Sequence, residues 1–194
     1  MPSNETRDTV LDVAQELLQT RGFNAFSFHD VAERVKIKTA SIHYYFPTKI
    51  DLCLALIARQ RDEVKAALDR IDAEVHEPTK KLARYVTLFR STLEMGNRMC
   101  LCGMLAADFE TLDPLVAEKL RLSFEDHEIW LKRVFMEGKR IGKLDFAGSP
   151  RNEARLLLSC LEGAMLVART FEDLSRFDSS ARSLLSRLRP RPNP

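Results

Sequence analysis

The sequence predicts an all-α fold of about nine helices, and three observations carry this prediction. Gly and Pro are scarce, at 7 and 8 of 194 residues, and no stretch alternates apolar and polar residues as a strand does. Three prolines stand just before a helical pattern rather than inside one, as in Glu77-Pro78, Asp113-Pro114 and Ser149-Pro150. Apolar residues recur at helical spacing, and a hydrophobic content of 45% is enough for a core.

Charge and composition exclude several classes of protein. The 30 Lys and Arg residues nearly cancel the 28 Asp and Glu residues, so a histone-like polycation is excluded and any contact with nucleic acid must come from a local patch. No run of about 18 apolar residues could span a membrane, and the polar Met1–Thr9 segment is unlike a signal peptide. We expect a cytoplasmic protein without membrane contact, with free thiols at Cys53, Cys100, Cys102 and Cys160.

The first three predicted helices lie near the N-terminus. An apolar stripe followed by a glycine predicts a helix over Asn4–Thr20. Ser27-x-x-Asp30 matches a capping box, which predicts that the next helix, Phe28–Val35, begins there. A tight turn then leads into a short helix over Thr39–Tyr45. Two short helices that meet across a brief turn and pack on a first helix form a helix-turn-helix.

The other helices are predicted from capping residues, prolines and length. Thr48-x-x-Asp51 is a second capping box, and the absence of Pro and Gly predicts one helix of about 40 Å over Thr48–Val75. Further helices are expected over Pro78–Met95, Arg98–Ala107, Pro114–Glu137, Pro150–Phe171 and Ser179–Leu188. We place one domain at residues 1–50 and a second at 51–189, and expect the basic, proline-rich residues 190–194 to be disordered.

The predicted helix over Thr39–Tyr45 has one apolar and one small, polar face. Ile42, Tyr45 and Phe46 share the apolar face, whereas the residues expected to point away are Ala40, His43 and Tyr44, with Ser41 at the flank. Slim, hydrogen-bonding residues suit a helix that enters the DNA major groove.

A local excess of positive charge surrounds this helix. Between residues 31 and 50, a single acidic residue, Glu33, stands against Arg34, Lys36, Lys38 and Lys49. The N-terminal amides of the long helix at Thr48 and Lys49 also favour a phosphate. The alternative interpretation is an ordinary three-helix packing unit with a solvated basic edge.

The segment Phe26–Leu52 resembles the DNA-binding signature of TetR-family transcriptional regulators. In that family a helix ending in Val-Ala is followed by a turn, a small-residue helix closing with Tyr/His-Tyr/His-Phe, a short turn, and Lys at the next helix start. Two positions depart from the pattern: Lys36 stands where Gly is usual, and Thr39 stands where Lys or Arg is usual. A residue other than Gly can adopt the left-handed turn conformation at some cost.

The resemblance implies a role for each matching position. Contacts with base edges or nearby phosphates are implied for Thr39, Ala40, Ser41 and His43, and contacts with the DNA backbone for Tyr44, Thr48 and Lys49. It also implies that the second domain binds a small-molecule inducer and forms a homodimer, and that the partner is a double-stranded DNA operator. Members of the family are more often repressors than activators.

Two apolar stripes are the candidates for dimerisation. Leu157, Leu161 and Ala164 line one face of the Pro150–Phe171 helix, and Leu184 and Leu188 line the last helix. Pairing of both helices across a two-fold axis would form a four-helix interface. The alternative is that both stripes belong to the protomer core.

Aromatic and sulfur-containing residues are the candidates for an inducer site. Such side chains suit an adaptable apolar pocket, and the set is Tyr85, Phe89, Cys100, Met104, Trp130 and Met165. His127 and Arg133 could provide a polar anchor. Plain core packing is the alternative for each of these side chains.

Cys100 carries a separate hypothesis. Gly96 is expected to end one helix and Asn97 to cap the next, which would place Cys100 in its first turn, where the helix start and Arg98 raise the thiolate fraction. The surrounding stretch resembles the Cys-Leu-x-x-x-Leu-x-Ala-acid segment of electrophile-responsive members of the same family. The alternative is a half-buried, inert cysteine.

No pattern supports catalysis, a metal site or a cofactor. The four histidines lack ligand spacing, Cys100-x-Cys102 lacks a second pair, and there is no glycine-rich phosphate loop. We therefore expect no enzyme, but a ligand-responsive repressor that a small molecule releases from a palindromic operator. The rival class is an all-α enzyme or a helical binding module without DNA binding, which a steep salt dependence of DNA affinity would exclude.

Overall fold

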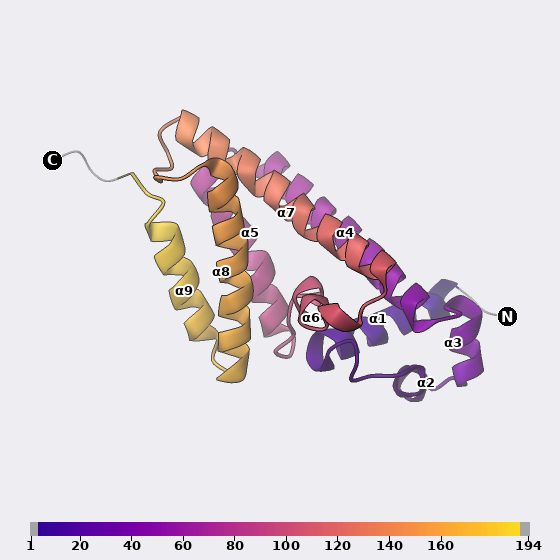
Figure 1. Ribbon diagram of the computed structural model, residues 1–194. Coiled ribbons are helices and arrows are strands. Elements are labelled where there is room, and N and C mark those ends of the chain that lie inside the picture. Colours follow the sequence, from indigo (N-terminus) through magenta and orange to yellow (C-terminus); the bar gives the residue numbers. More distant parts are fainter. Residues whose placement is uncertain (1–3, 191–194) are drawn as a thin grey trace. The chain divides into compact units, whose positions relative to one another are not determined.

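The computed structural model describes residues 4–190 (Figure 1). By contacts within the chain, it divides into two compact units. The first unit comprises residues 4–63 and 100–123, and the second comprises 64–99 and 124–190. The described residues form nine α-helices and one 3-10 turn without a strand, which confirms the predicted all-α class. Two helices, α4 (Lys49–Glu74) and α7 (Pro114–Arg140), contribute to both units. None of the helices among residues 4–190 combines the length and apolarity needed to cross a membrane.

The first unit is built around α1, which packs on α2, α3 and α6. Besides the first parts of α4 and α7, its elements are α1 (Asn4–Arg21), α2 (Phe28–Val35), α3 (Thr39–Tyr45), α6 (Leu101–Ala107) and the 3-10 turn η1 (Phe109–Thr111). Its core includes the fully buried Leu17, Leu18, Ile42, Leu52 and Leu56. The predicted bounds of α2 and α3 are confirmed.

Both predicted capping boxes are present. The Ser27 side chain accepts a hydrogen bond from the Asp30 amide, and Asp30 Oδ2 accepts from the Ser27 amide at 2.7 Å. In the same way, the Thr48 amide donates to Asp51 Oδ2 at 2.9 Å and the Asp51 amide donates to Thr48 Oγ1 at 3.1 Å. These reciprocal bonds satisfy amides that the helix itself leaves unpaired, and so fix where α2 and α4 begin.

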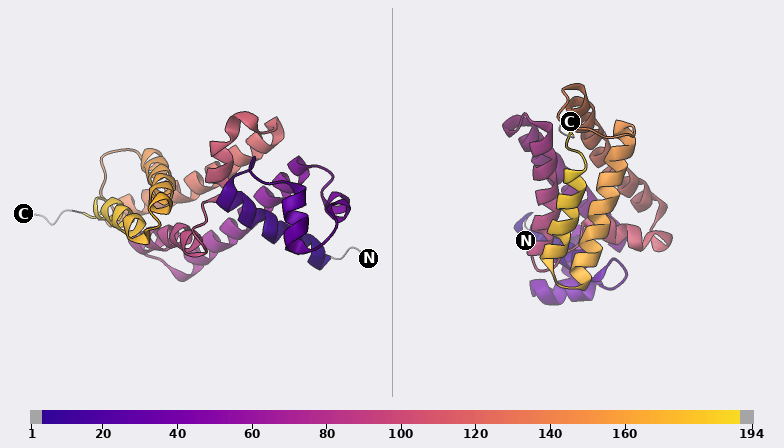
Figure 2. Two further views of the ribbon diagram at one scale, coloured as in Figure 1. Left: turned by 90° about the horizontal axis from the view of Figure 1, so that it is seen from below. Right: turned by 90° about the vertical axis from the view of Figure 1, so that its left-hand side faces the viewer.

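The second unit packs three helices against one another: α5 (Pro78–Glu94), α8 (Pro150–Thr170) and α9 (Leu174–Ser186). Figure 2 shows α8 and α9 side by side. The later parts of α4 and α7 belong to the same unit. Its fully buried side chains include Leu82, Tyr85, Phe135, Leu161 and Phe177.

Helix α7 runs three residues beyond the predicted end at Glu137. Gly138 lies inside the helix, just beyond the predicted end. A Cβ atom at this position would lie 2.3 Å from Cδ1 of Leu144, a side chain that is itself buried. The glycine therefore serves close packing of the loop that follows α7.

Two predicted helix starts are wrong. Helix α6 begins at Leu101 rather than Arg98, because Asn97 adopts a left-handed conformation (φ 59°) at the end of α5 and its side-chain amide donates to the Arg169 carbonyl at 3.2 Å. Helix α9 begins at Leu174 rather than Ser179, because the Asp173 side chain caps it by accepting from the Ser175 amide. The cap of α9 is local, whereas the bond of Asn97 reaches a residue 72 positions along the chain.

The predicted domain boundary at residue 50 stays a prediction. By contacts within the chain, residues 51–63 and 100–123 group with the first three helices, since α6 packs on α1. Of the tail predicted to be disordered, Pro190 is described and lies outside any helix, and residues 191–194 lie outside the described residues.

Candidate nucleic-acid interface

Helix α3 has the two faces that its sequence predicts. Ile42 and Phe46 are buried and Tyr45 is half-buried, so this side anchors the helix on the first unit. The opposite side is exposed and carries Ala40, Ser41, His43 and Tyr44, while Thr39 is half-buried. The Tyr44 side chain is 70% exposed, unusual for a residue with so much apolar surface.

Two lysines supply free positive charge beside this face. Lys36 and Lys38 are exposed, and neither ammonium group has an ion-pair partner within residues 4–190. Arg34, which the sequence grouped with them, instead pairs with Glu16 of α1 at 2.6 Å. Of the predicted basic patch, the two lysines of the α2–α3 turn are therefore available to phosphates.

The α2–α3 turn contains a strained residue. Lys36 adopts the left-handed conformation (φ 61°, ψ 43°) that the turn requires, and its amide donates to the carbonyls of Ala32 and Glu33. A side chain with a Cβ atom pays for this conformation, whereas glycine does not.

Replacing Lys36 by glycine is expected to stabilise the protein and weaken DNA binding at once. Relief of the left-handed strain should raise the free energy of unfolding by about 0.5–1 kcal/mol. Loss of one cation per protomer should lower the salt slope of DNA binding by about 2 per dimer. Urea unfolding and anisotropy titrations measure both. Lys38→Gln is the control: it should lower the salt slope similarly without any gain in stability, and an equal gain there would contradict the strain argument.

Lys49 does not have the position that a phosphate ligand needs. Its ammonium group donates to the backbone carbonyls of Phe23 and Phe26 and lies 4.5 and 4.3 Å from the centres of their rings. Burial lowers the pKa of Lys49, against the opposing effect of Cys53 and Asp108. The lysine thus ties the loop before α2 to the start of α4 inside the first unit. Thr48, beside it, is exposed and caps α4.

The same loop is held from its other side by residues that sequence analysis missed. The Phe23 amide donates to Asp108 Oδ2 at 2.8 Å, and the Asn24 side chain donates to Thr111 Oγ1 at 2.8 Å. Gly22 has a φ of 95°, and a Cβ atom there would lie 3.3 Å from Asp108 Oδ2. No local pattern signals these contacts, because Asp108 is 85 residues from Phe23.

Three of the predicted inducer residues meet in the core of the second unit. The Tyr85 ring stacks on Trp130 with centres 5.5 Å apart and contacts Phe89 at 5.3 Å. All three are buried, as is Met165. Cys100 and Met104 are half-buried and belong to the first unit. In this structure the aromatic set packs as core, and its part in binding an inducer stays a prediction.

His127 is the polar centre of this aromatic cluster. The Tyr85 hydroxyl lies 2.8 Å from His127 Nδ1, and the rings of Tyr85 and Phe89 both contact the imidazole. Burial lowers the pKa of His127 from 6.5 to about 4, with Asp126 opposing the shift. The ring is therefore neutral at physiological pH, and its Nδ1 shares a hydrogen bond with the tyrosine hydroxyl.

The cluster predicts loss of stability in mild acid. Because the pKa of His127 is lower in the folded protein than the usual 6.5, the unfolded chain takes up a proton first as the pH falls, and folding loses free energy. Between pH 8 and pH 5 this amounts to about 2 kcal/mol. Urea unfolding at both pH values measures it: His127→Gln should flatten the pH dependence and the exposed His76→Gln should keep it. An unchanged dependence in His127→Gln would contradict the assignment.

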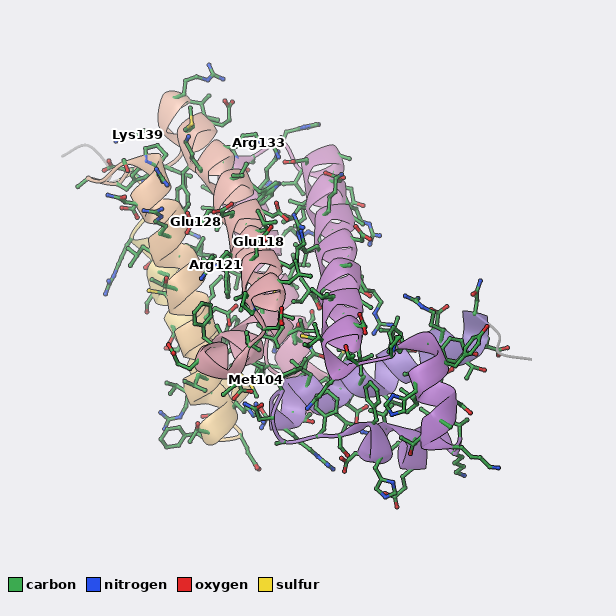
Figure 3. The ribbon with its side chains drawn as sticks, turned by 45° about the vertical axis from the view of Figure 1, so that its right-hand side comes forward. Met104, Glu118, Arg121, Glu128, Arg133 and Lys139 are labelled. Atoms are coloured by element: carbon green, nitrogen blue, oxygen red, sulfur yellow. The ribbon has the colours of Figure 1, made fainter. Side chains whose placement is uncertain are left out.

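A second polar group holds the end of α4. Asp72 accepts hydrogen bonds from Lys81 of α5 and from Trp130 Nε1 of α7, and it pairs with Arg133. Figure 3 labels Arg133 on α7. Burial acts to raise the pKa of Asp72, but the bonds from Lys81 and Trp130 outweigh it and hold the pKa below its usual value. Arg133, a predicted polar anchor for an inducer, is used here to bind a helix of its own chain.

Two grooves of the second unit lie apart from the predicted inducer residues. One, of about 370 Å³, lies between the ends of α5 and α8 and the start of α9, beside Leu93, Asn97 and Glu172. The other, of about 520 Å³, lies between the start of α5, the loop after α7 and the end of α9, beside Lys80 and Leu185. Neither is lined by any of the six residues proposed from sequence.

The predicted dimerisation stripe belongs largely to the protomer. Leu157, Leu161 and Leu188 are buried within the single chain, because α8 and α9 use that face to pack on each other and on α5. Ala164 and Leu184 are half-buried. The three leucines pack within the protomer, and their part in dimerisation stays a prediction. The apolar residues left exposed on and just after α8 are Leu156, Leu166, Val167 and Phe171.

Cys100 does not occupy the first turn of a helix. It is the residue that precedes α6, with a backbone outside the helical region and without a capping hydrogen bond from its side chain. Cys100 therefore lies just before the helical turn in which its sequence context places it, and a raised thiolate fraction stays a prediction. Of the other cysteines, Cys53 is buried, and burial raises the pKa of its thiol to about 12.

Comparison with known proteins agrees with this geometry. The family model for "Bacterial regulatory proteins, tetR family" matches residues 10–56, which contain α2, α3 and the start of α4. A TetR transcriptional regulator from Legionella pneumophila is 32% identical, over 97% of this chain and 100% of its own, with a TM-score of 0.87. The chain belongs to the TetR family. A TetR-family regulator from Agrobacterium tumefaciens, 29% identical over 96% of this chain and 99% of its own, has a TM-score of 0.93.

Curated TetR-family relatives differ in how much of them this chain matches. The repressor LfrR of Mycolicibacterium smegmatis is 28% identical over 85% of this chain and 93% of its own length. The match covers only 38% of the repressor KstR and 56% of the activator FasR of the same organism. The relatives named in these comparisons are regulators of transcription, and they include repressors as well as an activator.

Proposed function

We propose that this chain is a cytoplasmic, homodimeric repressor that binds a palindromic operator through α3 and is released by a small molecule. One observation carries the proposal: an exposed polar face of α3, with Tyr44 70% exposed, beside two lysines that no described acidic residue neutralises. A recognition helix needs this combination of slim polar residues and free cations. The names of LfrR and KstR, both transcriptional repressors, support repression rather than activation.

Each residue of the interface has a proposed role. Base edges are assigned to the outward residues of α3 and its start: Thr39, Ala40, Ser41 and His43. Phosphates are assigned to the side chains at the margins: Lys36, Lys38, Tyr44 and Thr48. Lys49 acts indirectly, because its ammonium group is engaged by the carbonyls of Phe23 and Phe26. The proposal assigns no catalytic role to any residue.

The proposed dimer uses the outward face of α8. Leu156, Gly163 and Val167 follow at intervals of seven and four residues and so share one stripe of this helix. The two apolar side chains are about half exposed, and a Cβ atom at Gly163 would meet nothing within 4 Å. A glycine inside a helix costs about 1 kcal/mol relative to alanine. Because glycine has no side chain, it would let the backbone of a second copy of α8 approach closely.

Release is proposed to act through α4, which contributes to both units. Asp72 ties the later part of α4 to α5 through Lys81 and to α7 through Trp130. An inducer that repacks Tyr85, Phe89, Trp130 and Met165, or that contacts Cys100 and Met104, would shift this helix end and change the separation of the recognition helices. Such a ligand acts only by binding one separation more tightly than the other.

The test is binding to duplex DNA from upstream of the chain's own gene. Anisotropy titrations at 50 and 200 mM salt should show a steep loss of affinity, about a thousandfold or more for a dimer with six or more phosphate contacts. Tyr44→Ala should weaken binding to all sequences about equally. Affinity that is independent of salt, or unchanged by Tyr44→Ala, would overturn the assignment of this face.

A further inference from the structure

The imidazole of His43 is held in place on the exposed face of α3. Its Nδ1 atom lies 3.1 Å from the carbonyl oxygen of Pro47, just beyond the C-terminal end of the helix. The Phe28 ring meets it edge-on, with centres 4.8 Å apart and planes at 68°. Within residues 4–190, Nε2 has no hydrogen-bond partner, and the residue is exposed.

These contacts fix which nitrogen of the neutral ring carries the proton. A carbonyl oxygen only accepts hydrogen bonds, so the Nδ1–Pro47 contact requires the proton on Nδ1. Nε2 of the neutral imidazole is then a bare lone pair that accepts and cannot donate. The Nδ1 partner is a backbone carbonyl of the turn that follows α3. The fold therefore sets the tautomer of His43 in the absence of any ligand.

This property sets His43 apart from its neighbours on the helix. The hydroxyl groups of Thr39, Ser41 and Tyr44 donate or accept as the partner demands, and Ala40 does neither. The lysines only donate. Among the outward side chains of α3, neutral His43 is therefore the one that presents only a hydrogen-bond acceptor to a ligand.

We propose that His43 reads an adenine or a cytosine in the operator, by accepting a hydrogen bond at Nε2 from the exocyclic amino group of the base. The proposal rests on the proposed function, because it needs α3 to lie in the major groove. There, the only hydrogen-bond donors on base edges are N6–H of adenine and N4–H of cytosine. Guanine offers N7 and O6 and thymine offers O4, all acceptors, and phosphate oxygens are acceptors too. A bare Nε2 is repelled by all of these.

The first experiment needs no DNA. Two-bond ¹H–¹⁵N spectra of the ¹⁵N-labelled protein at pH 8 distinguish a protonated from a bare ring nitrogen, and His43→Gln assigns the signals by their loss. The expected result is a protonated Nδ1 and a bare Nε2 in His43. A proton on Nε2 overturns the proposal and leaves the proposed function untouched.

The second experiment selects binding sites from a randomised duplex library with the wild type, His43→Phe and His43→Arg. The wild type should show adenine or cytosine at one dyad-related pair of positions. His43→Phe should lose that preference and bind the wild-type site about tenfold more weakly, and His43→Arg, a donor, should move the preference to guanine. If His43→Phe instead weakens all sequences equally and lowers the salt slope, His43 contacts phosphate and the proposal fails. A wild type that binds no duplex overturns the proposed function and the base contact together, even if the ring has the expected tautomer.

Discussion

Replacing Lys49 by alanine is expected to lower the free energy of unfolding by about 3 kcal/mol. The side chain donates to two backbone carbonyls and lies against two aromatic rings, in a half-buried position that water does not readily refill. A hydrogen bond from a charged donor contributes about 1.5–3 kcal/mol, and each ring contact about 0.5–1 kcal/mol. The loop before α2 should loosen, and DNA affinity should fall because fewer molecules hold the recognition helix in place.

Urea unfolding combined with DNA titration distinguishes this role from a phosphate contact. Lys38→Ala is the matched control, because its ammonium group is exposed and has no ion-pair partner in the described part of the chain. It should weaken DNA binding and leave the unfolding midpoint in place. If Lys49→Ala behaved like Lys38→Ala in both measurements, Lys49 would be a phosphate ligand and the role drawn from its internal contacts would be wrong.

Placing two acidic residues on the outward face of α8, as Leu156→Glu with Val167→Glu, is expected to give a folded monomer that loses at least a hundredfold in operator affinity. Both side chains are about half exposed in the single chain, so the protomer tolerates the change. In a two-fold dimer the same surface meets itself, and the new charges would face one another in an apolar contact. A monomer with one recognition helix also loses the avidity of two half-sites, which is about 10²–10⁴-fold.

Light scattering gives the mass of each variant, and circular dichroism verifies its fold. Ile141→Glu, at an exposed apolar residue just after α7, is the matched control and should remain a dimer. A dimeric Leu156→Glu/Val167→Glu variant would place the interface elsewhere on the protein.

The sequence predicted the parts of the fold that depend on neighbouring residues. The capping boxes at Ser27 and Thr48 join residues three positions apart, so their local pattern was sufficient. The outward face of α3 follows from helical periodicity alone, and Ile42 and Phe46 are buried as expected.

Features that depend on distant residues could not be predicted. The role of Lys49 is set by carbonyls 23 and 26 residues away, and a basic residue at a helix start reads equally well as a phosphate ligand. Helix α8 is apolar on more than one side, so periodicity could not tell which stripe packs on α5 and α9. The pattern therefore favoured Leu157 and Leu161 as interface residues, whereas the exposed stripe contains Leu156 and Val167.

The most direct test of DNA recognition by a dimeric helix-turn-helix protein is a footprint on the DNA upstream of the chain's own gene. Hydroxyl-radical cleavage maps the protected backbone, and dimethyl sulfate reactivity at guanine N7 reports on the major groove. We expect two protected patches related by a dyad, with centres one helical turn of about 34–36 Å or a multiple of it apart, and protection of the major groove within each. Tyr44→Ala should erase both patches at the same protein concentration. Protection limited to a single patch, or to the minor groove, would contradict the account.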